Sequence, residues 1–182
     1  MKLRFLADIK KAGSSCKPFE GTRLYVDTGS VDRTLIVSST EVSFSDKPSR
    51  ANLCARAGDV LFAKMQGTIK VLGIDPALAQ NIYSTGFYAF NDKRILPGYM
   101  RHFFLSPSFN DEKDRLSNGA TMKAINDDGM RQITIPCPSL DRQAEITAEL
   151  DSLESSVALA QNQLSLLNEQ VKSLFNGRRI TA

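Results

Sequence analysis

Residues 142–176 read RQAEITAELDSLESSVALAQNQLSLLNEQVKSLFN, and this stretch decides the architecture of the chain. It contains neither glycine nor proline, and good helix formers dominate it. Its apolar residues recur at alternating spacings of four and three, which is the heptad pattern of a coiled coil. The a positions are Leu150, Val157, Leu164 and Val171, and the d positions are Ile146, Leu153, Ala160, Leu167 and Leu174.

The flanking residues set the bounds of this predicted helix. Ser139 or Asp141 can serve as its N-cap, and Gly177 as its C-cap residue. We therefore expect a dimerisation helix over residues 139–177, roughly 50 Å long at 1.5 Å per residue, and a basic tail over residues 178–182.

The alternative is an amphipathic helix packed on the chain's own globular part. Such a helix usually carries a wider apolar face than the narrow a/d stripe seen here, so the pattern favours pairing with a second helix. The positions beside the stripe are mostly Gln, Asn, Ser and Glu. Charge therefore does not decide the polarity of the pair.

Residues 1–138 predict a globular domain with short strands separated by Gly, Asp, Ser and Pro. The predicted strands are residues 24–26, 34–37, 42–44, 60–63, 69–72, 86–90 and 132–135. Pro97 and Pro107 suit the first turns of two helices, and Ser106 suits the N-cap of the second. The predicted fold class is α+β, a mixed-sheet domain followed by one long C-terminal coiled-coil helix.

Composition places the chain among ordinary globular proteins, with 42% hydrophobic and 24% charged residues. Its three cysteines are odd in number and form no C-x-x-C pair, which argues against a disulfide framework or a zinc site and fits a reducing cytoplasm. No apolar run resembles a signal peptide or reaches the length needed to cross a membrane. We expect a cytoplasmic protein without a membrane partner.

The charge is unevenly distributed along the chain. Residues 1–140 hold 19 Lys and Arg against 14 Asp and Glu, whereas residues 141–182 hold 4 against 6. The first region is therefore the one suited to a polyanion. Many ordinary proteins carry such an imbalance, so it favours nucleic acid only weakly.

Motifs for catalysis are missing from the sequence. It has no phosphate-binding loop, no G-x-G-x-x-G, no G-x-S-x-G and no H-E-x-x-H. The single histidine, His102, lies in an apolar run and is expected to be a packed or surface helix residue. The pairs Asp111-Glu112 and Asp127-Asp128 are expected in solvated loops rather than at a metal. We therefore expect a protein that is not an enzyme, with no cofactor and no metal.

Three stretches, in this order, resemble the specificity (S) subunit of type I restriction–modification systems. Residues 47–71, with Gly58-Asp59-Val60 at their centre, resemble the strand and loop of a target-recognition domain. Residues 84–100 are similar to a later strand and helix of that domain. Residues 119–146 are similar to its passage into the long helix. Each stretch is loose alone, but their order together with the heptad helix is fairly specific and covers nearly the whole chain.

The resemblance implies a DNA-reading subunit without chemistry of its own. The family's usual subunit carries two recognition domains and two helices, so this chain resembles a half-length form with one of each. Two copies would then pair through antiparallel helices and read an interrupted palindrome in double-stranded DNA. The implied partners are an adenine methyltransferase (M) subunit, which binds S-adenosylmethionine, and a translocase/nuclease (R) subunit.

Three polar loops of the first region are candidates for DNA contact. The candidate DNA-binding residues are Arg50, Asn52, Lys64, Gln66, Thr68, Lys70, Thr121 and Lys123. The competing interpretation is that these loops are solvated turns. Lys10-Lys11 and Arg178-Arg179 are more typical of solvated chain ends.

Two other functions remain open at this point. A coiled-coil protein-assembly module with a protein-binding head would lack sequence-selective DNA binding. An enzyme with an unrecognised site is the weakest of the three hypotheses, because the residues form no catalytic constellation.

Overall fold

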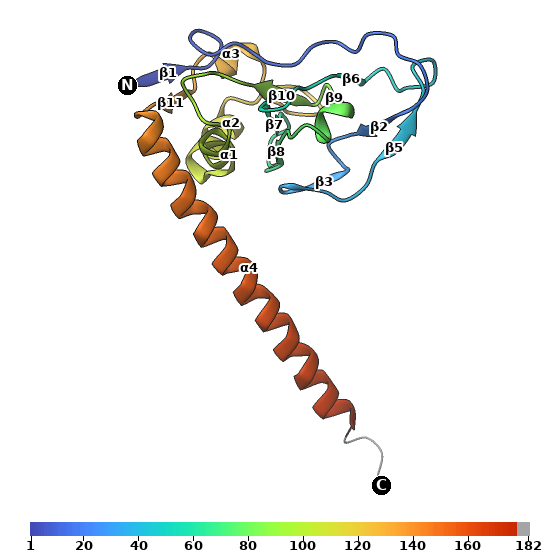
Figure 1. Cartoon of the computed structure of the whole chain (residues 1–182), viewed down its shortest axis with the longest axis vertical. Helices are drawn as coiled ribbons and strands as arrows, with labels where there is room; N and C mark the ends of the chain where they lie inside the picture. The colour runs from blue at the N-terminus through green and yellow to red at the C-terminus, as the bar shows by residue number, and fades with distance from the viewer. Residues whose placement is uncertain (178–182) are drawn as a thin grey trace. The chain divides into compact units, whose positions relative to one another are not determined.

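The structure is a computed structural model that describes residues 1–177. The chain divides into two compact units, the head unit Met1–Ala144 and a helical unit that begins at Glu145. Figure 1 shows short strands and helices in the first and a single helix in the second. The predicted α+β class, with mixed sheets followed by one long helix, is confirmed.

The centre of the head unit is a three-stranded antiparallel sheet. Strand β7 (Val60–Ala63) lies between β10 (Phe87–Phe90) and β8 (Val71–Gly73). Every residue of β7 and β10 is buried, so these strands pack on both faces.

The second sheet of the head unit is four-stranded and mixed. Its strands follow the order β5 (Thr40–Val42), β2 (Arg23–Val26), β9 (Ile82–Ser84) and β6 (Ala51–Leu53). The pair β2 and β9 is parallel, and the other two pairs are antiparallel.

Two further strand pairs complete the head unit. β1 (Lys2–Arg4) pairs with β11 (Thr134–Pro136), which ties the N-terminus to the segment that leads into the long helix. β3 (Val31–Asp32) and β4 (Leu35–Ile36) form a small hairpin.

Proline and serine start the two main helices of the head unit where the sequence predicts them. Helix α1 (Pro97–Leu105) and helix α2 (Pro107–Arg115) each begin with proline, and the Ser106 hydroxyl accepts a hydrogen bond from the Phe109 amide at 3.3 Å. A 3-10 turn, η1 (Leu78–Gln80), precedes β9.

The interpretation of both acidic pairs as loop residues is wrong, because Asp111 and Glu112 lie within α2. The second pair, Asp127 and Asp128, is helical too. They occupy the first turn of a short helix, α3 (Asp127–Met130), whose N-cap is Asn126. Carboxylates in a first turn suit the helix dipole, and the Asn126 side chain accepts from the Gly129 amide at 3.0 Å.

Some strands lie a few residues from their predicted positions, and others were not predicted. The predicted strand 42–44 corresponds to β5, and 69–72 corresponds to β8, each shifted by about two residues. The sequence pattern missed β1, β3, β6 and β9, which are only two or three residues long.

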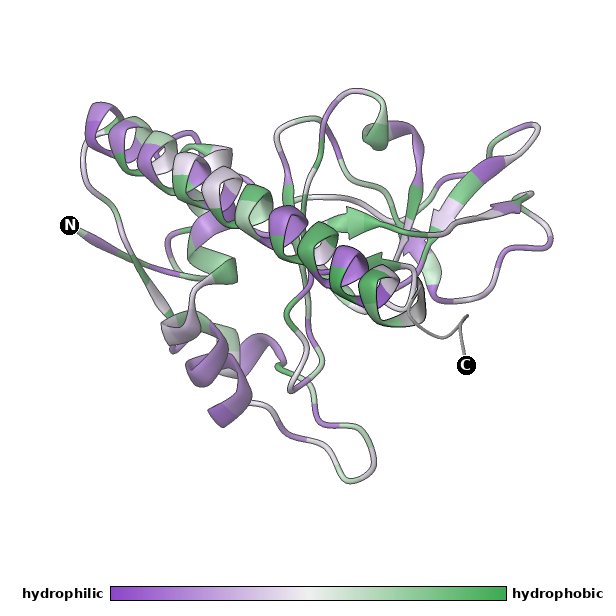
Figure 2. Cartoon of the chain, turned by 90° about the horizontal axis from the view of Figure 1, so that it is seen from below, coloured by the Kyte–Doolittle hydropathy of each residue, from purple (hydrophilic) through white to green (hydrophobic). Residues whose placement is uncertain are grey.

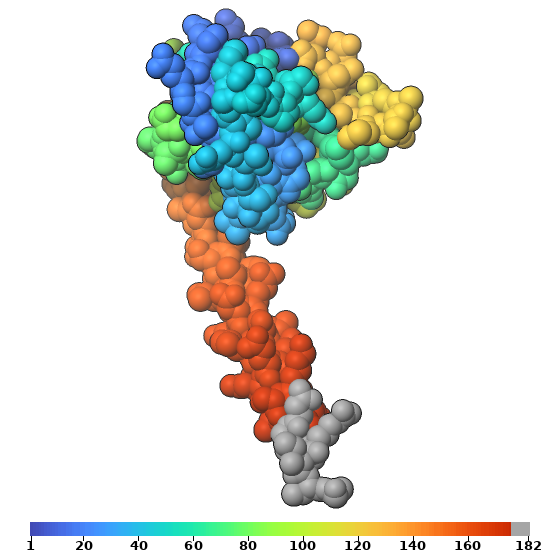
Figure 3. Space-filling view, turned by 90° about the vertical axis from the view of Figure 1, so that its right-hand side faces the viewer, coloured from blue at the N-terminus to red at the C-terminus, as the bar shows by residue number. Residues whose placement is uncertain are grey.

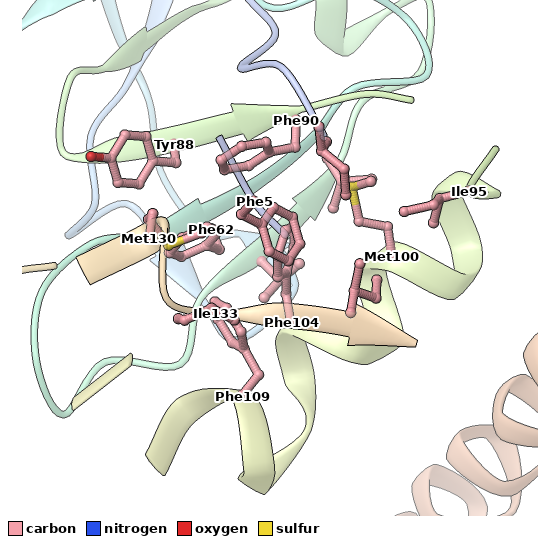
Figure 4. Close-up of a cluster of buried hydrophobic side chains, with 14 of the residues drawn as sticks. Phe5, Phe62, Tyr88, Phe90, Ile95, Met100, Phe104, Phe109, Met130 and Ile133 are labelled. Atoms are coloured by element: carbon pink, nitrogen blue, oxygen red, sulfur yellow. The ribbon is translucent and has the colours of Figure 1, made fainter. Parts of the chain in front are cut away.

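Phenylalanine dominates the core of the head unit (Figure 4). Phe62 of β7 meets Phe104 of α1 with ring centroids 4.7 Å apart, and Phe109 of α2 meets Phe62 at 5.0 Å. Phe5 and Phe90 close the cluster at 5.0 Å. Such contacts add to the free energy of burying the rings, so this cluster fixes the sheet against the two helices.

Helix α4 (Leu140–Gly177) forms the C-terminal part of the described chain. The Ser139 hydroxyl accepts from the Arg142 amide at 3.4 Å, which agrees with its expected N-cap role. Apolar and polar residues alternate along the helix in Figure 2. Arg178, Arg179 and the rest of the predicted basic tail, 178–182, lie outside the described residues. Over residues 1–177, none of the helices combines the length and the apolar character that crossing a membrane requires.

Candidate nucleic-acid interface

The three candidate DNA-contact loops meet at one pocket of about 260 Å³ in the head unit. We call it the basic pocket. It is lined by Thr28, Arg50, Lys64, Met65, Thr85, Gly86, Met122, Lys123 and Ala124. Three positive side chains therefore surround a partly apolar hollow, a combination that suits a polyanion with flat apolar groups.

Backbone hydrogen bonds hold the three loops together. The Gln66 amide donates to the Lys123 carbonyl at 3.0 Å, and the Ile125 amide donates to the Lys64 carbonyl at 3.0 Å. On the other side, the Thr85 amide donates to the Arg50 carbonyl at 2.9 Å. Figure 3 shows the segments near residues 65 and 120, in green and gold, as neighbours on one face of the head unit. Main-chain pairing thus brings residues distant in sequence to one place.

Arg50 and Lys123 are the available cations of the pocket. Both side chains are exposed, and within residues 1–177 neither has a hydrogen-bond or ion-pair partner. An unpaired guanidinium or ammonium on the surface can bind a phosphate or a base edge without first breaking an internal contact.

Lys64 is held more firmly than its neighbours. Its ammonium donates to the Thr85 carbonyl at 2.8 Å and lies 4.1 Å from the centre of the Tyr88 ring. Burial lowers the pKa of Lys64, and the nearby charge of Lys11 lowers it further. Lys64 therefore supports the pocket wall as well as contributing charge.

Four other candidate residues are engaged within the head unit. Asn52 lies in β6, and its side-chain oxygen accepts from the Cys16 amide at 3.1 Å. The Gln66 amide group donates to the Asp114 carbonyl at 3.2 Å, and the Lys70 ammonium donates to the Thr28 carbonyl at 2.7 Å. Thr68 is half-buried.

Thr121 is exposed in the same segment as Lys123. It shares with Arg50 and Lys123 a side chain that makes no hydrogen bond within the described residues. The candidates therefore fall into two groups. Arg50, Thr121 and Lys123 have free side chains, and only Arg50 and Lys123 of these line the pocket, whereas the other candidates make contacts within the head unit.

Lys11 lies near Lys64, and its exposed side chain is paired rather than free in solvent. Its ammonium forms an ion pair with Asp127 at 2.6 Å, and the Tyr88 hydroxyl donates to the same carboxylate. The hydrogen bond from Lys11 lowers the pKa of Asp127 most, and the hydrogen bond from Tyr88 lowers it further. Burial raises the pKa of Tyr88, which keeps its hydroxyl a proton donor.

Sequence reasoning missed several pocket residues. Thr28, Thr85 and Gly86 have common loop chemistry and no distinctive spacing. A Cβ atom added to Gly86 would approach the Thr28 methyl to 3.0 Å and the Arg50 guanidinium to 3.4 Å. Gly86 therefore leaves the space in which the Arg50 side chain lies.

His102 is buried in helix α1, as expected of a packed helix residue. The described part of the chain offers no nucleophile–base pair at the basic pocket, whose polar groups are cations and hydroxyls. Such groups suit the binding of an anion.

Comparison with known proteins identifies the family. A family model described as "Type I restriction modification DNA specificity domain" matches residues 17–169. No match was found among curated proteins.

Two solved structures are similar over nearly the whole chain. The HsdS subunit from Thermoanaerobacter tengcongensis is 25% identical, with a TM-score of 0.79, and the match covers 96% of this chain and 46% of that one. A structure from work on complex assembly and conformational transition of the type I R-M system is also 25% identical, with a TM-score of 0.84, covering 99% and 48%.

This chain thus spans about half the length of those structures. The family model alone matches well over half of the chain, and the family is one of recognition domains rather than enzymes. The chain belongs to the type I restriction modification DNA specificity domain family.

Proposed function

We propose that this chain reads DNA sequence for a type I restriction–modification complex, pairs as a dimer to recognise a bipartite site, and docks methyltransferase subunits. The observation that carries the proposal is the basic pocket, where three loops bring Arg50, Lys64 and Lys123 together. Proteins of this kind anchor themselves on phosphates and read base edges.

The pocket's residues suit a division of labour on DNA. The free guanidinium of Arg50 can bind guanine or a phosphate with two hydrogen bonds, whereas Lys123 offers a point charge for phosphate. Met122 is 58% exposed on the pocket's rim and can meet apolar base atoms such as a thymine methyl.

Pairing through α4 is supported by the exposure of its apolar seam. Leu153, Val157 and Leu164 are 55%, 55% and 59% exposed in the single chain. The further seam residues Leu167, Val171 and Leu174 are also exposed. Burying a leucine contributes about 1.5–3 kcal/mol, so a paired seam stabilises a dimer.

The dimer would place two recognition units in one assembly. The solved relatives are about twice as long as this chain, which supports two units per specificity subunit. Two identical units related by a two-fold axis would read an interrupted palindrome. The antiparallel polarity of the helices follows from the family resemblance.

Docking of a methyltransferase subunit is supported by apolar residues outside the seam. Leu159 and Leu166 are exposed, seven residues apart, and both fall at position c of the heptad. A two-helix coiled coil buries a and d but leaves c in solvent. A second apolar row of this kind suits another partner helix. We place the assembly in the cytoplasm, where a nuclease subunit would also join it.

The deciding experiment is co-purification of this chain with an adenine methyltransferase subunit, followed by genome-wide mapping of methylated adenines. We expect methylation at an interrupted palindrome, lost or altered with Arg50→Ala. Replacing Leu159 and Leu166 with Ser should release the methyltransferase while the chain stays dimeric. Methylation sites that do not change with the Arg50→Ala chain would contradict the proposal.

A protein-binding head is the second candidate. It is favoured by Leu35 and Val37 around strand β4, which are 67% and 62% exposed. Replacing both with Ser separates the two functions, because a DNA-reading head would keep its DNA selectivity and a protein-binding head would lose its partner.

A further inference from the structure

Lys113 of helix α2 is a buried lysine that binds the turn formed by residues 65–68. Its side chain is only 1% exposed. Its ammonium donates to the Met65 carbonyl at 3.3 Å and to the Thr68 carbonyl. A buried ammonium is costly unless it is hydrogen-bonded and paired, and here it binds both ends of the turn 65–68.

Asp114, the next residue of α2, binds the middle of the same turn. Its carboxylate accepts from the Gly67 amide at 3.0 Å, and its carbonyl accepts from the Gln66 side chain at 3.2 Å. The carboxylate also lies 3.5 Å from the Lys113 ammonium. Two consecutive residues of α2 thus bind all four residues of the turn.

The turn has few restraints within its own four residues. Gly67 has a φ of +70°, which glycine adopts without steric cost. Because glycine also adopts many other conformations easily, this residue alone does not fix the shape of the turn. The turn's own hydrogen bond, from the Thr68 amide to the Met65 carbonyl, is long at 3.3 Å. The contacts from α2 therefore add to the main-chain hydrogen bonds that hold the turn, among them the one from the Gln66 amide to the Lys123 carbonyl.

The turn 65–68 contacts two parts of the basic pocket. Met65 lines the pocket, and the Gln66 amide donates to the carbonyl of Lys123. A shift of the turn therefore moves a pocket wall and the segment that carries a free cation.

Helix α2 has a separate anchor in the core. Phe109, one turn before Lys113, points into the phenylalanine cluster (Figure 4). Its contacts with Phe62 and Phe104 do not involve the turn. The contacts of Lys113 and Asp114 can therefore be removed while the core stays packed.

We propose that Lys113 and Asp114 are positioning residues for DNA reading, which hold the turn 65–68 so that the basic pocket fits a base edge. Lys113 does not touch DNA. This inference rests on the proposed function, because it takes a rigid turn to be necessary for selective DNA binding.

The test compares Lys113→Met with Lys93→Met in the full chain. Both changes remove one positive charge from the head unit, but Lys93 is exposed and lies outside the basic pocket. The probe is a pool of double-stranded oligonucleotides with a randomised segment, from which each protein selects its preferred sequences. Binding of the selected duplex and of an unrelated duplex is then measured against salt concentration.

We expect Lys113→Met to reduce the preference for the selected duplex over the unrelated one by about tenfold, the scale of one weakened base contact. Its salt dependence should equal that of Lys93→Met, because no phosphate contact is lost. Asp114→Ala should behave like Lys113→Met, whereas Asp114→Asn, which keeps an oxygen for the Gly67 amide, should restore most of the preference. If Lys113→Met does not fold, the comparison of Asp114→Ala with Asp114→Asn tests the proposal instead.

An unchanged preference in Lys113→Met and Asp114→Ala would overturn the inference while leaving the proposed function intact. A salt slope lower by about one for Lys113→Met than for Lys93→Met would also overturn it, because that marks a direct phosphate contact. If the unaltered chain selects no sequence from the pool, the proposed function fails, and this inference fails with it.

Discussion

In the helical unit, the residues that act together lie three or four positions apart in the sequence, whereas the residues lining the basic pocket come from segments as distant as Thr28 and Ala124. The helix is a local structure with a periodic apolar seam. The pocket exists only because strands and turns bring its loops together through main-chain hydrogen bonds. Substitutions should therefore act differently in the two regions: on assembly in the helix, and on selectivity in the pocket.

The largest expected effect comes from breaking the seam. Replacing Leu153 and Leu164 together with Asp should weaken dimerisation by at least about 100-fold, because two leucines at ~1.5–3 kcal/mol each lose their burial and two charges replace them. Sedimentation equilibrium measures this. The matched control carries Asn162→Asp and Ser165→Asp, which add the same charges outside the seam and should leave the dimer intact. A persistent dimer in the seam variant would show that α4 does not pair through this stripe.

That seam is also the part of the molecule best predicted from sequence. Helix α4 covers Leu140–Gly177 against a prediction of 139–177, because heptad spacing, helix propensity and the N-cap all act locally. Proline at the starts of α1 and α2 is predictive for the same reason. The pairing of the seam with a second chain stays a prediction.

The contacts around the basic pocket could be predicted from the sequence only in part. The sequence pattern selected Arg50, Lys64 and Lys123 from three loops, and the structure places all three around one pocket. It did not indicate that Lys113, within the polar run 111–115, is buried, because a lysine among acidic residues normally marks a solvated helix face. Lys113 is buried where its ammonium donates to the Met65 and Thr68 carbonyls of the turn that connects β7 and β8, a contact between segments far apart in the sequence.

A second prediction sharpens the comparison where the two regions join in sequence. Gln143 lies in the first turn of α4 but belongs to the head unit. Its side chain accepts from the Leu96 amide at 2.8 Å and donates to the carbonyls of Arg94 and Pro138 at 2.8 and 3.0 Å. Gln143→Leu should lower the free energy of unfolding of the head by about 2–3 kcal/mol, because buried polar groups lose their partners.

Urea unfolding followed by tyrosine fluorescence measures this change, since the chain has no tryptophan. Gln161→Leu, the same substitution at an exposed position of α4, is the control and should have little effect. Equal stability of the two variants would mean that Gln143 does not bind the helix start to the head.

A third prediction separates two roles within the pocket. Arg50→Ala should cost about 1–3 kcal/mol on the preferred DNA sequence and relax selectivity at one position, as expected for a base contact. Lys123→Ala should weaken binding to all sequences alike and lower the salt slope by about 0.9. Fluorescence anisotropy at several salt concentrations distinguishes them. Both side chains are exposed, so thermal stability should not change.

The smallest effect concerns a cation that, unlike Arg50 and Lys123, is already paired. Because Lys11 and Tyr88 hold the pKa of Asp127 below 3.8, folded Asp127 binds fewer protons than the unfolded chain does in acid. The stabilisation is therefore complete above the unfolded pKa and is lost as the pH falls through the folded pKa. Both partners of the ion pair are more than a third exposed, so solvent screening limits the effect to less than about 1 kcal/mol.

Urea unfolding at about pH 6 and about pH 3 should show this extra loss in the unaltered chain and not in Asp127→Asn, which cannot titrate. Lys11→Met should reduce the loss in part, because the Tyr88 hydroxyl still donates to the carboxylate. Identical acid sensitivity in all three proteins would mean that the Lys11–Asp127 pair adds nothing to folding. Lys11 would then be as available to an anion as the two free cations on the pocket's rim, and the distinction between paired and free cations in the head unit would lose its basis.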